Sequence, residues 1–219
     1  MRFIIFSLAF LFSVGAAAQG SVTLQAKVFV YNPPRDTSVW NWLERKPGFA
    51  GLSSYEQQLF YWTNIMRRNP SLFFETVIQE FLRQFPEAHT REVQDLAQDI
   101  KKTPTSLPML APDAALHRMA TAHAIDLKNR GGIISHQSAT GKSFAQRIKE
   151  YGTFHCAAEN IYVGSNDPLE ALIVLLIDHN VPNKGHRINL LHPAYGRMGV
   201  GWQQLKEGRS LLVQEFACP

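Results

Sequence analysis

Ala158-Glu159-Asn160-Ile161-Tyr162-Val163 places an acid and an amide directly before a short apolar run. Residues 160–163 are predicted to form a short buried strand, because three apolar residues follow one another there. A carboxylate beside such a strand is costly to bury unless a partner stabilises it, so Glu159 needs a cation or a donor close by. Two explanations are open: a structural ion pair, for example with Arg187, or a place in a functional cleft.

Three other short segments carry groups that fit such a cleft. They are Ser135-His136, Ile177-Asp178 with Gly185-His186-Arg187, and Gly199-Val200-Gly201. Asp178 ends an apolar helix, where the helix dipole disfavours an anion, so a cation or a donor is expected beside it. We predict that His136, Glu159, Asp178 and His186 converge on one cleft, which would bind a metal ion or transfer protons.

Neither histidine belongs to a local metal-binding motif. His136 and His186 are 50 positions apart, so a shared metal depends on the tertiary fold bringing them together. Taken alone, His136 is better explained as a solvent-exposed loop residue. His123 lies on the apolar face of a predicted helix and is better explained as a buried, hydrogen-bonded residue than as a ligand.

The order of predicted elements indicates the fold class. Helices are expected mostly in the first part of the chain, and antiparallel strands in the second. The helices are predicted at 53–69, 71–86, 88–101, 112–130, 143–151 and 168–178, and the strands at 19–34, 160–163, 197–204 and 210–216. Residues 40–43 are assigned to a linker. This order predicts an α+β layered domain and not a doubly wound parallel sheet.

The first eighteen residues have the layout of a secretory signal peptide. Arg2 gives a positive start, residues 3–14 are almost all apolar, and Ala16-Ala17-Ala18 offers small residues for cleavage. A membrane anchor is the alternative, but the apolar stretch is short for a span. Export places Cys156 and Cys218 in an oxidising compartment, which favours a disulfide over two buried free thiols.

Charge excludes one class of partner. The whole chain has a formal net charge of +4, and loss of Arg2 with the signal segment would lower it to +3. The excess is small and scattered, and no basic stripe carries interleaved aromatic residues. Nucleic acid is therefore not expected as a partner. No stretch after the signal segment is long enough to span a membrane.

Five motifs, in this order and near this spacing, resemble the CAP superfamily of cysteine-rich secretory proteins, antigen 5 and plant pathogenesis-related proteins, whose domain is also called SCP. The resemblance covers about residues 53–217. The motifs are Leu110-Ala111-Pro112-Asp113-Ala114-Ala115-Leu116, Ser135-His136, Ala158-Glu159-Asn160-Ile161, Gly185-His186-Arg187-Ile188-Asn189-Leu190-Leu191 and Met198-Gly199-Val200-Gly201. We therefore predict three parts: the signal peptide at 1–18, an N-terminal extension at 19–52 with no counterpart in the family, and a CAP/SCP-like domain at 53–219, which the resemblance implies.

The resemblance implies an α-β-α sandwich with a central antiparallel sheet and a cleft that holds two histidines and two acids. By position, His136 and His186 are the two histidines and Glu159 is one acid. Many members have a glutamate in the helix after the Glu-Asn strand. Here Asp178 is the nearest candidate, and His179 could substitute for it. A tryptophan common in that helix and the multiple disulfides of eukaryotic members are missing.

Two functions are compatible with this site. The first is a secreted binding domain, extracellular or periplasmic. It would hold a divalent metal, with zinc as the expected ion, on His136 and His186, and would bind an unknown partner, lipid or cell-surface ligand. The second is a metal-assisted hydrolase, for example a peptidase, with Glu159 as general base and Asp178 as a second acid. No nucleophile is evident, so binding is favoured. We expect Glu159 to matter more for the site than for the fold.

Overall fold

The computed structural model describes residues 27–219. The predicted signal peptide and most of the strand predicted at 19–34 lie outside the described residues. Residues 27–36 form no strand, so this part of the prediction is wrong. The backbone of Val30 pairs instead with a side-chain amide, because its N–H donates to Gln84 Oε1 at 3.1 Å and its carbonyl accepts from Gln84 Nε2 at 2.7 Å.

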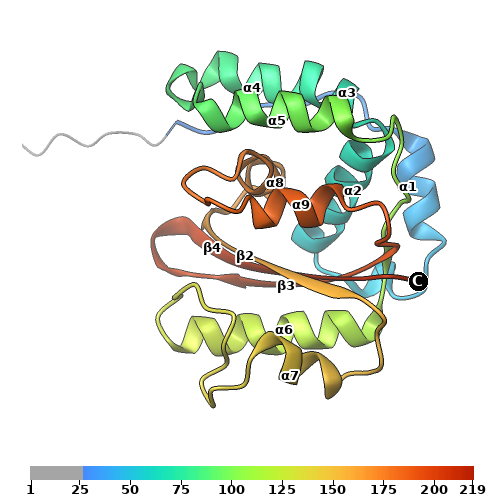
Figure 1. Ribbon diagram of the computed structural model, residues 1–219, viewed down its shortest axis with the longest axis vertical. Helices are drawn as coiled ribbons and strands as arrows, with labels where there is room; N and C mark the ends of the chain where they lie inside the picture. The colour runs from blue at the N-terminus through green and yellow to red at the C-terminus, as the bar shows by residue number, and fades with distance from the viewer. Residues whose placement is uncertain (1–26) are drawn as a thin grey trace, which may run out of the picture.

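A four-stranded sheet lies at the centre of the molecule (Figure 1). Its order is β1-β3-β4-β2, so β4 (Arg209–Ala217) runs between β3 (Arg197–Gln204) and β2 (Ala157–Ser165). Both of these strands are antiparallel to β4, whereas β1 (Ala111–Pro112) has two residues and pairs in parallel with β3. The predicted antiparallel sheet is therefore confirmed, with a short parallel addition that makes it mixed.

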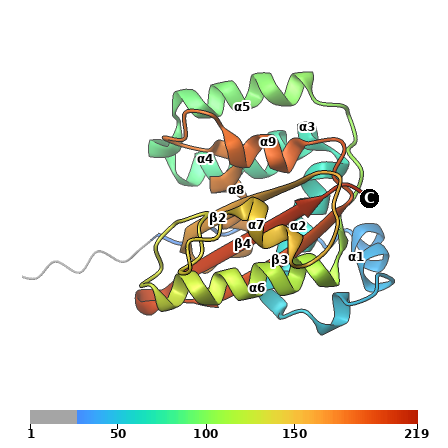
Figure 2. The same ribbon diagram turned by 60° about the horizontal axis from the view of Figure 1, so that its bottom comes forward.

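Helices cover both faces of this sheet. One face carries α6 (Ala114–Asn129) and α7 (Phe144–Lys149), and Figure 2 shows α6 running along the strands. The other face carries α2 (Ser54–Arg68), α8 (Pro168–Ile177) and α9 (Gly185–Leu191). The α-β-α sandwich is thus confirmed, with a further layer of helices outside α8 and α9 in Figure 1.

The Gly-Val-Gly motif explains how closely α6 lies on the sheet. A Cβ atom added to Gly199 would overlap backbone atoms of Leu116, and one added to Gly201 would overlap backbone atoms of Ala120. Both glycines are in β3, and both overlapped residues are one turn apart in α6. Only a strand without side chains at these two positions allows the helix backbone to approach this far.

The helices of the first half largely follow their predicted signals. Ser53 and Glu56 form the expected capping box of α2. The next helix is capped by Asn69, with Pro70 at its first position, and not by Ser71 as predicted. It runs as α3 (Pro70–Phe73), a π-helical turn η2 (Phe74–Ile78) and α4 (Gln79–Gln84), and is followed by η3 (Pro86–Ala88) and α5 (Arg91–Lys102).

The segment assigned to a linker is a helix. Asp36 caps α1 (Thr37–Glu44), accepting from the backbone N–H groups of Ser38 and Val39. The helix buries Val39 and Leu43 completely, so the apolar patch at 40–43 belongs to a packed element. A short 3₁₀ turn, η1 (Phe49–Gly51), connects α1 to α2.

Successive side chains of each strand point to opposite faces of the sheet, so the core has two layers. Ile161 of β2 and Val213 of β4 pack with residues of α6, whereas Tyr162 and Leu212 pack with the larger core on the other face. Side chains two positions apart in a strand share a face. Glu159 is therefore on the α6 side of the sheet.

The predicted disulfide between Cys156 and Cys218 is present, with Cα atoms 5.5 Å apart. It joins the residue before β2 to the residue after β4. The two cysteines are next to Ala157 and Ala217, which are partners at this end of the β2–β4 ladder. The hairpin between β3 and β4 is also as predicted, with a short 3₁₀ turn, η4 (Lys206–Gly208), at its tip.

Candidate functional site

His136 lies in the loop that follows α6. Gly131 and Gly132 reverse the chain there, with φ angles of 84° and 78° that favour glycine. The loop is held by the backbone carbonyl of Ser135, which accepts from His123 Nε2 at 2.9 Å. His136 Nδ1 lies 2.7 Å from Glu159 Oε1, and its side chain is 56% exposed. The Nδ1 edge of the ring is therefore held by Glu159, while much of the rest of the ring is exposed to solvent.

Glu159 is buried and has two partners. Besides His136, the guanidinium of Arg147 on α7 donates from Nη2 to Glu159 Oε2 at 2.6 Å, and the same nitrogen reaches the carbonyl of His136 at 3.3 Å. Burial by itself would raise the pKa of Glu159, but the hydrogen bond from His136 and the charge of Arg147 outweigh it and lower the pKa. The cation is Arg147 and not Arg187, the partner suggested by the sequence.

Asp178 has the donors that its position at a helix C-terminus required. Its carboxylate accepts from the backbone N–H groups of His186 at 3.0 Å and Arg187 at 3.2 Å, at the start of α9. It also accepts from His186 Nδ1 at 2.6 Å. The residue adopts a left-handed conformation, with φ of 58°, so the chain turns sharply between α8 and α9. The carboxylate at the end of one helix thus caps the start of another.

Arg187 has a structural role. Its guanidinium donates to Asp99 Oδ2 at 2.8 Å and to the backbone carbonyls of Leu176, Ile177 and Glu92. Its side chain is 1% exposed. These bonds join α9 to the end of α8 and to α5, and hold the turn that positions Asp178 and His186.

The two histidine–acid pairs lie on opposite sides of β2, the edge strand of the sheet. Glu159 points to the α6 layer, whereas Asn160 points to α9, donating to the carbonyl of His186 at 3.4 Å. Asn189 of α9 donates to Asn160 Oδ1 at 2.8 Å and to the backbone carbonyl of Glu159 at 3.4 Å. The second residue of the Glu-Asn motif therefore ties α9 to the strand that carries the first.

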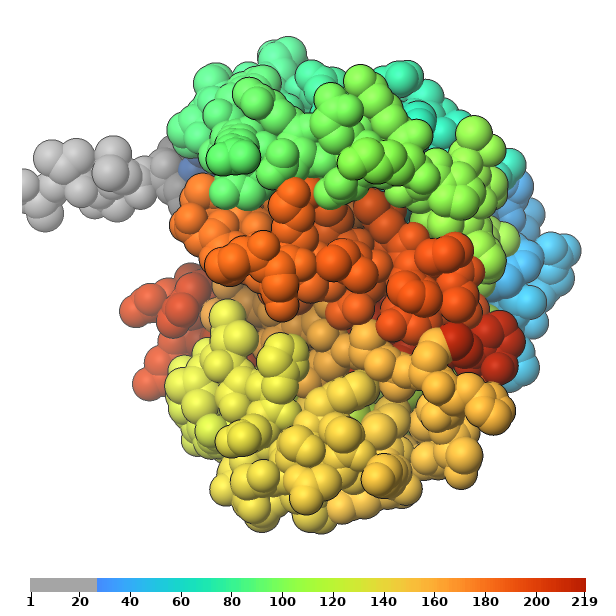
Figure 3. Space-filling view, in the orientation of Figure 1, coloured from blue at the N-terminus to red at the C-terminus, as the bar shows by residue number. Residues whose placement is uncertain are grey.

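The surface is furrowed between these two sides. Figure 3 shows the segment that includes α9, in orange, facing the yellow segment after α6 across a shallow furrow. Each histidine is paired with one acid: His136 with Glu159, and His186 with Asp178. Among residues 27–219, no group of three or more His, Cys, Asp or Glu side chains is arranged to hold a metal ion.

Sequence reasoning missed two members of the buried cluster around Glu159. Glu215 of β4 is directly opposite Glu159 in the β2–β4 register and is completely buried. Arg147 Nη1 lies 3.6 Å from Glu215 Oε1. An acid at 215 shares the strand face of Val213 and Leu211, and this polar residue in an apolar alternation was the available signal. Nothing local marked Arg147, because only the tertiary fold brings α7 to the strands.

His123 completes this cluster. It is 3% exposed, as expected for a buried, hydrogen-bonded histidine, and its Nε2 lies 3.8 Å from Glu159 Oε2. Desolvation lowers the pKa of His123, so the ring is neutral at neutral pH. Burial and the neighbouring Glu159 raise the pKa of Glu215 well above its usual range.

Comparison with known proteins agrees with this arrangement of motifs. The family described as the cysteine-rich secretory protein family, CAP, matches residues 74–216, more than half of the chain. The chain belongs to the CAP family. The resemblance drawn from the five motifs is therefore confirmed, and β1 to β4, α6 to α9 and both histidine–acid pairs lie within, or next to, the matched part of the CAP domain.

Proteins similar to this CAP domain include bacterial and parasite proteins. The uncharacterized protein YkwD of Bacillus subtilis (strain 168) is 29% identical over 130 residues, which are 59% of this chain and 47% of YkwD. An extracellular SCP-domain protein from Bacillus anthracis is 27% identical, with a TM-score of 0.44 over 58% of this chain and 40% of that chain. Venom allergen-like protein 4 of Schistosoma mansoni is 13% identical, with a TM-score of 0.45 over 76% and 90%.

The chain spans less than half the length of the two Bacillus relatives. A further similar structure, an outer surface protein of Borrelia burgdorferi, is 23% identical, with a TM-score of 0.45 over 57% of this chain and 87% of that chain. In the described part of the CAP protein, no helix has both the length and the apolar character needed to cross a bilayer.

Proposed function

We propose that this protein is a secreted CAP domain that binds one divalent metal ion, zinc, between His136 and His186, and uses the cleft to bind a lipid or cell-surface ligand. One observation carries the proposal. In both imidazoles Nδ1 lies within 2.7 Å of a buried carboxylate oxygen, on Glu159 or on Asp178.

This pairing prepares both rings for a metal. A carboxylate accepts a hydrogen bond from Nδ1–H, so the proton stays on Nδ1 and the lone pair is on Nε2, which is the usual arrangement in carboxylate–histidine–zinc sites. Nε2 of neither ring is bonded to another residue of the described chain. Two histidine ligands would leave the other positions of a zinc ion to water or to a ligand. The donor set therefore fits a weak, open site, where a bound ion would attract an anionic or carbonyl group.

The geometry counts against the hydrolase alternative with Glu159 as general base. The Glu159 side chain is 1% exposed, and its oxygens are engaged by His136 and Arg147. Its lowered pKa makes it a weak base. Asp178 is equally enclosed, with a side chain that is 0% exposed. Both acids are better suited to hold histidines in place than to take a proton from water.

Secretion is supported by three observations of different kinds. The first eighteen residues have the signal-peptide layout, and the chain contains a disulfide, which persists in oxidising compartments. Two similar structures are named as an extracellular protein and an outer surface protein. A ligand in the medium or at a cell surface is consistent with this location.

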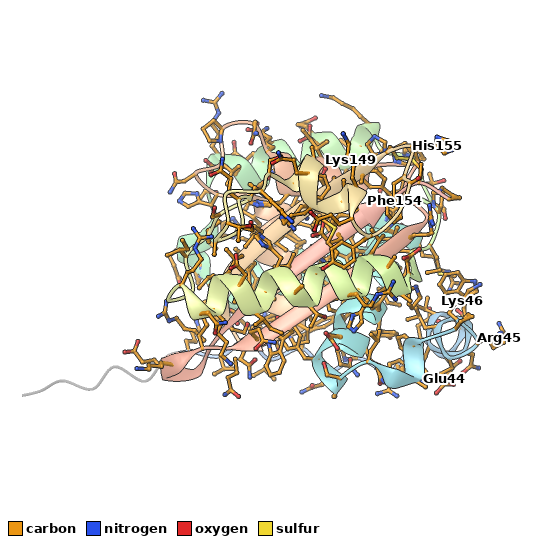
Figure 4. All side chains as sticks on the ribbon, turned by 90° about the horizontal axis from the view of Figure 1, so that it is seen from below. Glu44, Arg45, Lys46, Lys149, Phe154 and His155 are labelled. Carbon is orange, nitrogen blue, oxygen red and sulfur yellow. A yellow bond between two sulfur atoms is a disulfide. The ribbon has the colours of Figure 1, made fainter. Side chains whose placement is uncertain are left out.

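A zinc titration of the mature protein tests the proposal. Calorimetry should give one zinc per chain for the wild type and none for His136→Ala/His186→Ala. His155→Ala is the matched control, because this exposed histidine lies in the loop before β2, and Figure 4 shows it at the edge of the molecule. Protons compete with zinc for an imidazole nitrogen, so binding should weaken as pH falls. Equal zinc uptake by the wild type and the double variant would contradict the proposal.

A further inference from the structure

We infer that Glu215 is a positioning residue for Glu159 and, through it, for His136. Glu215 is held as a neutral carboxylic acid next to Glu159 on the neighbouring strand, and donates a hydrogen bond to the Glu159 carboxylate. It thereby holds the Glu159 side chain oriented toward His136. The inference rests on the proposed function where it concerns metal binding, and stands on the buried cluster alone where it concerns the proton.

The geometry brings the two acids together with no room for solvent. Glu159 and Glu215 are opposite residues of neighbouring antiparallel strands, a position in which side chains on the same face are neighbours. The Glu159 side chain is 1% exposed and that of Glu215 is 0% exposed. Register fixes this contact, because β2 and β4 are paired over their whole length.

A count of charges requires one of the two acids to be neutral. Arg147 is the cation shared by both, and His123 is neutral because desolvation lowers its pKa. Two ionised carboxylates would leave this buried cluster with a net negative charge, which is costly in a low-dielectric interior. Like charges this close favour a single proton shared by the pair. The groups that face the pair are His123 and Asp126 of α6, Arg147 of α7 and His136 of the loop.

Contacts decide which acid keeps the proton. Arg147 is 2.6 Å from Glu159 but 3.6 Å from Glu215, and His136 binds only Glu159. Neither carboxyl oxygen of Glu215 accepts a hydrogen bond from a described residue, and Arg147 Nη1 is 3.6 Å from Oε1, beyond hydrogen-bond distance. An ionised Glu215 would leave both oxygens without a hydrogen bond, whereas a protonated one supplies its own O–H to Glu159. Burial and the neighbouring Glu159 raise the pKa of Glu215, in agreement with this assignment.

The hydrogen bond from Glu215 affects the exposed His136 through Glu159, which contacts both residues. Its two oxygens must serve Arg147, Glu215 and His136, and the hydrogen bond from behind holds the carboxylate in the plane that His136 uses. Residues that orient a metal-binding histidine in this way usually change metal affinity by about 10–100-fold when they are removed. Glutamine at position 215 would retain a neutral donor, whereas leucine would retain only the volume.

Stability as a function of pH tests the buried proton. A group with a raised pKa in the folded state contributes stability that is lost as pH rises from its unfolded value, about 4.3, toward the folded value. Wild type and Glu215→Gln should melt alike near pH 4, and the glutamine variant should melt several degrees higher at pH 8. Glu75→Gln removes an exposed acid as the control and should show no such divergence. A melting difference that does not vary between pH 4 and 8 would overturn the inference.

The state of His136 tests the positioning role without any metal. Nitrogen chemical shifts should show its proton on Nδ1 in the wild type and in Glu215→Gln, and a mixture of tautomers in Glu215→Leu. Zinc affinity should follow the same order, with a loss of about tenfold or more for leucine.

A wild type that takes no zinc would reject the metal proposal only, since the pH and tautomer results would still stand. An unchanged tautomer in a folded leucine variant would overturn the positioning role, and Glu215→Gln tests the proton even if leucine prevents folding.

Discussion

At the scale of single residues, Glu159 belongs to the fold as much as to the site. The sequence identified His136, Glu159, Asp178 and His186, because each departs from the pattern around it. It could not identify Arg147, whose only signal is its place in the folded chain, and this contact changes what Glu159 does. The carboxylate neutralises a guanidinium that is 8% exposed, so the expectation that Glu159 matters more for the site than for the fold does not follow from the geometry.

The substitution Glu159→Gln is accordingly predicted to destabilise the protein. It leaves Arg147 buried without its closest anion, and breaking a buried ion pair from one side typically costs about 3–5 kcal/mol. Urea denaturation at pH 7 measures this loss. The loss should shrink as pH falls, because the lowered pKa of Glu159 gives stability that is present above its unfolded pKa and is lost as pH falls through the folded value.

A double substitution separates the ion pair from other effects. Replacing Arg147 by methionine together with Glu159→Gln removes both charges, and should restore part of the stability that the single change loses. If the single variant keeps the wild-type midpoint, the pair contributes nothing and Glu159 returns to a role in the site alone.

At the scale of elements, the sequence predicted those with strong local signals. The capping box of α2, the proline at the first position of α8 and the glycines after α6 are each visible in the sequence and each hold in the structure. Helix α1 was missed because it is short and its apolar residues, Val39 and Leu43, resemble a patch in a linker. The extension at 27–36 was assigned to a strand from its alternation, but its backbone pairs with the side chain of Gln84.

The close approach of α6 to β3 gives an element-scale prediction. Gly201→Ala places a methyl group against the backbone of Ala120, so the helix must shift away from the sheet. Overpacking a core contact typically costs about 1–3 kcal/mol. Thermal melting should therefore fall clearly for Gly201→Ala, but not for Gly51→Ala, where a Cβ meets no atom within 4 Å. Equal melting of the two variants would mean that α6 can move without cost.

At the scale of the whole molecule, the layers and the site depend on each other. Edge strand β2 directs Glu159 to the α6 layer and Asn160 to α9, and Asn160 and Asn189 join α9 to this strand. The layered class could be predicted because helices and strands are segregated along the chain. The pairing of each histidine with one acid could not, because it depends on which face of β2 each side chain takes and on the turn after α8.

The disulfide is the covalent link at this scale, and its loss should affect stability more than the site. Cys156 and Cys218 are 62 positions apart, and chain-entropy estimates for a loop of this size are about 4 kcal/mol. Cys156→Ser/Cys218→Ser should therefore melt well below the wild type. Zinc binding, if present in the wild type, should persist at low temperature, because the β2–β4 ladder sets the place of Glu159 independently of the disulfide.

Thiol counting on unreduced, denatured wild type should find no reactive thiol. Two thiols per chain would show that the bond does not form in the isolated protein.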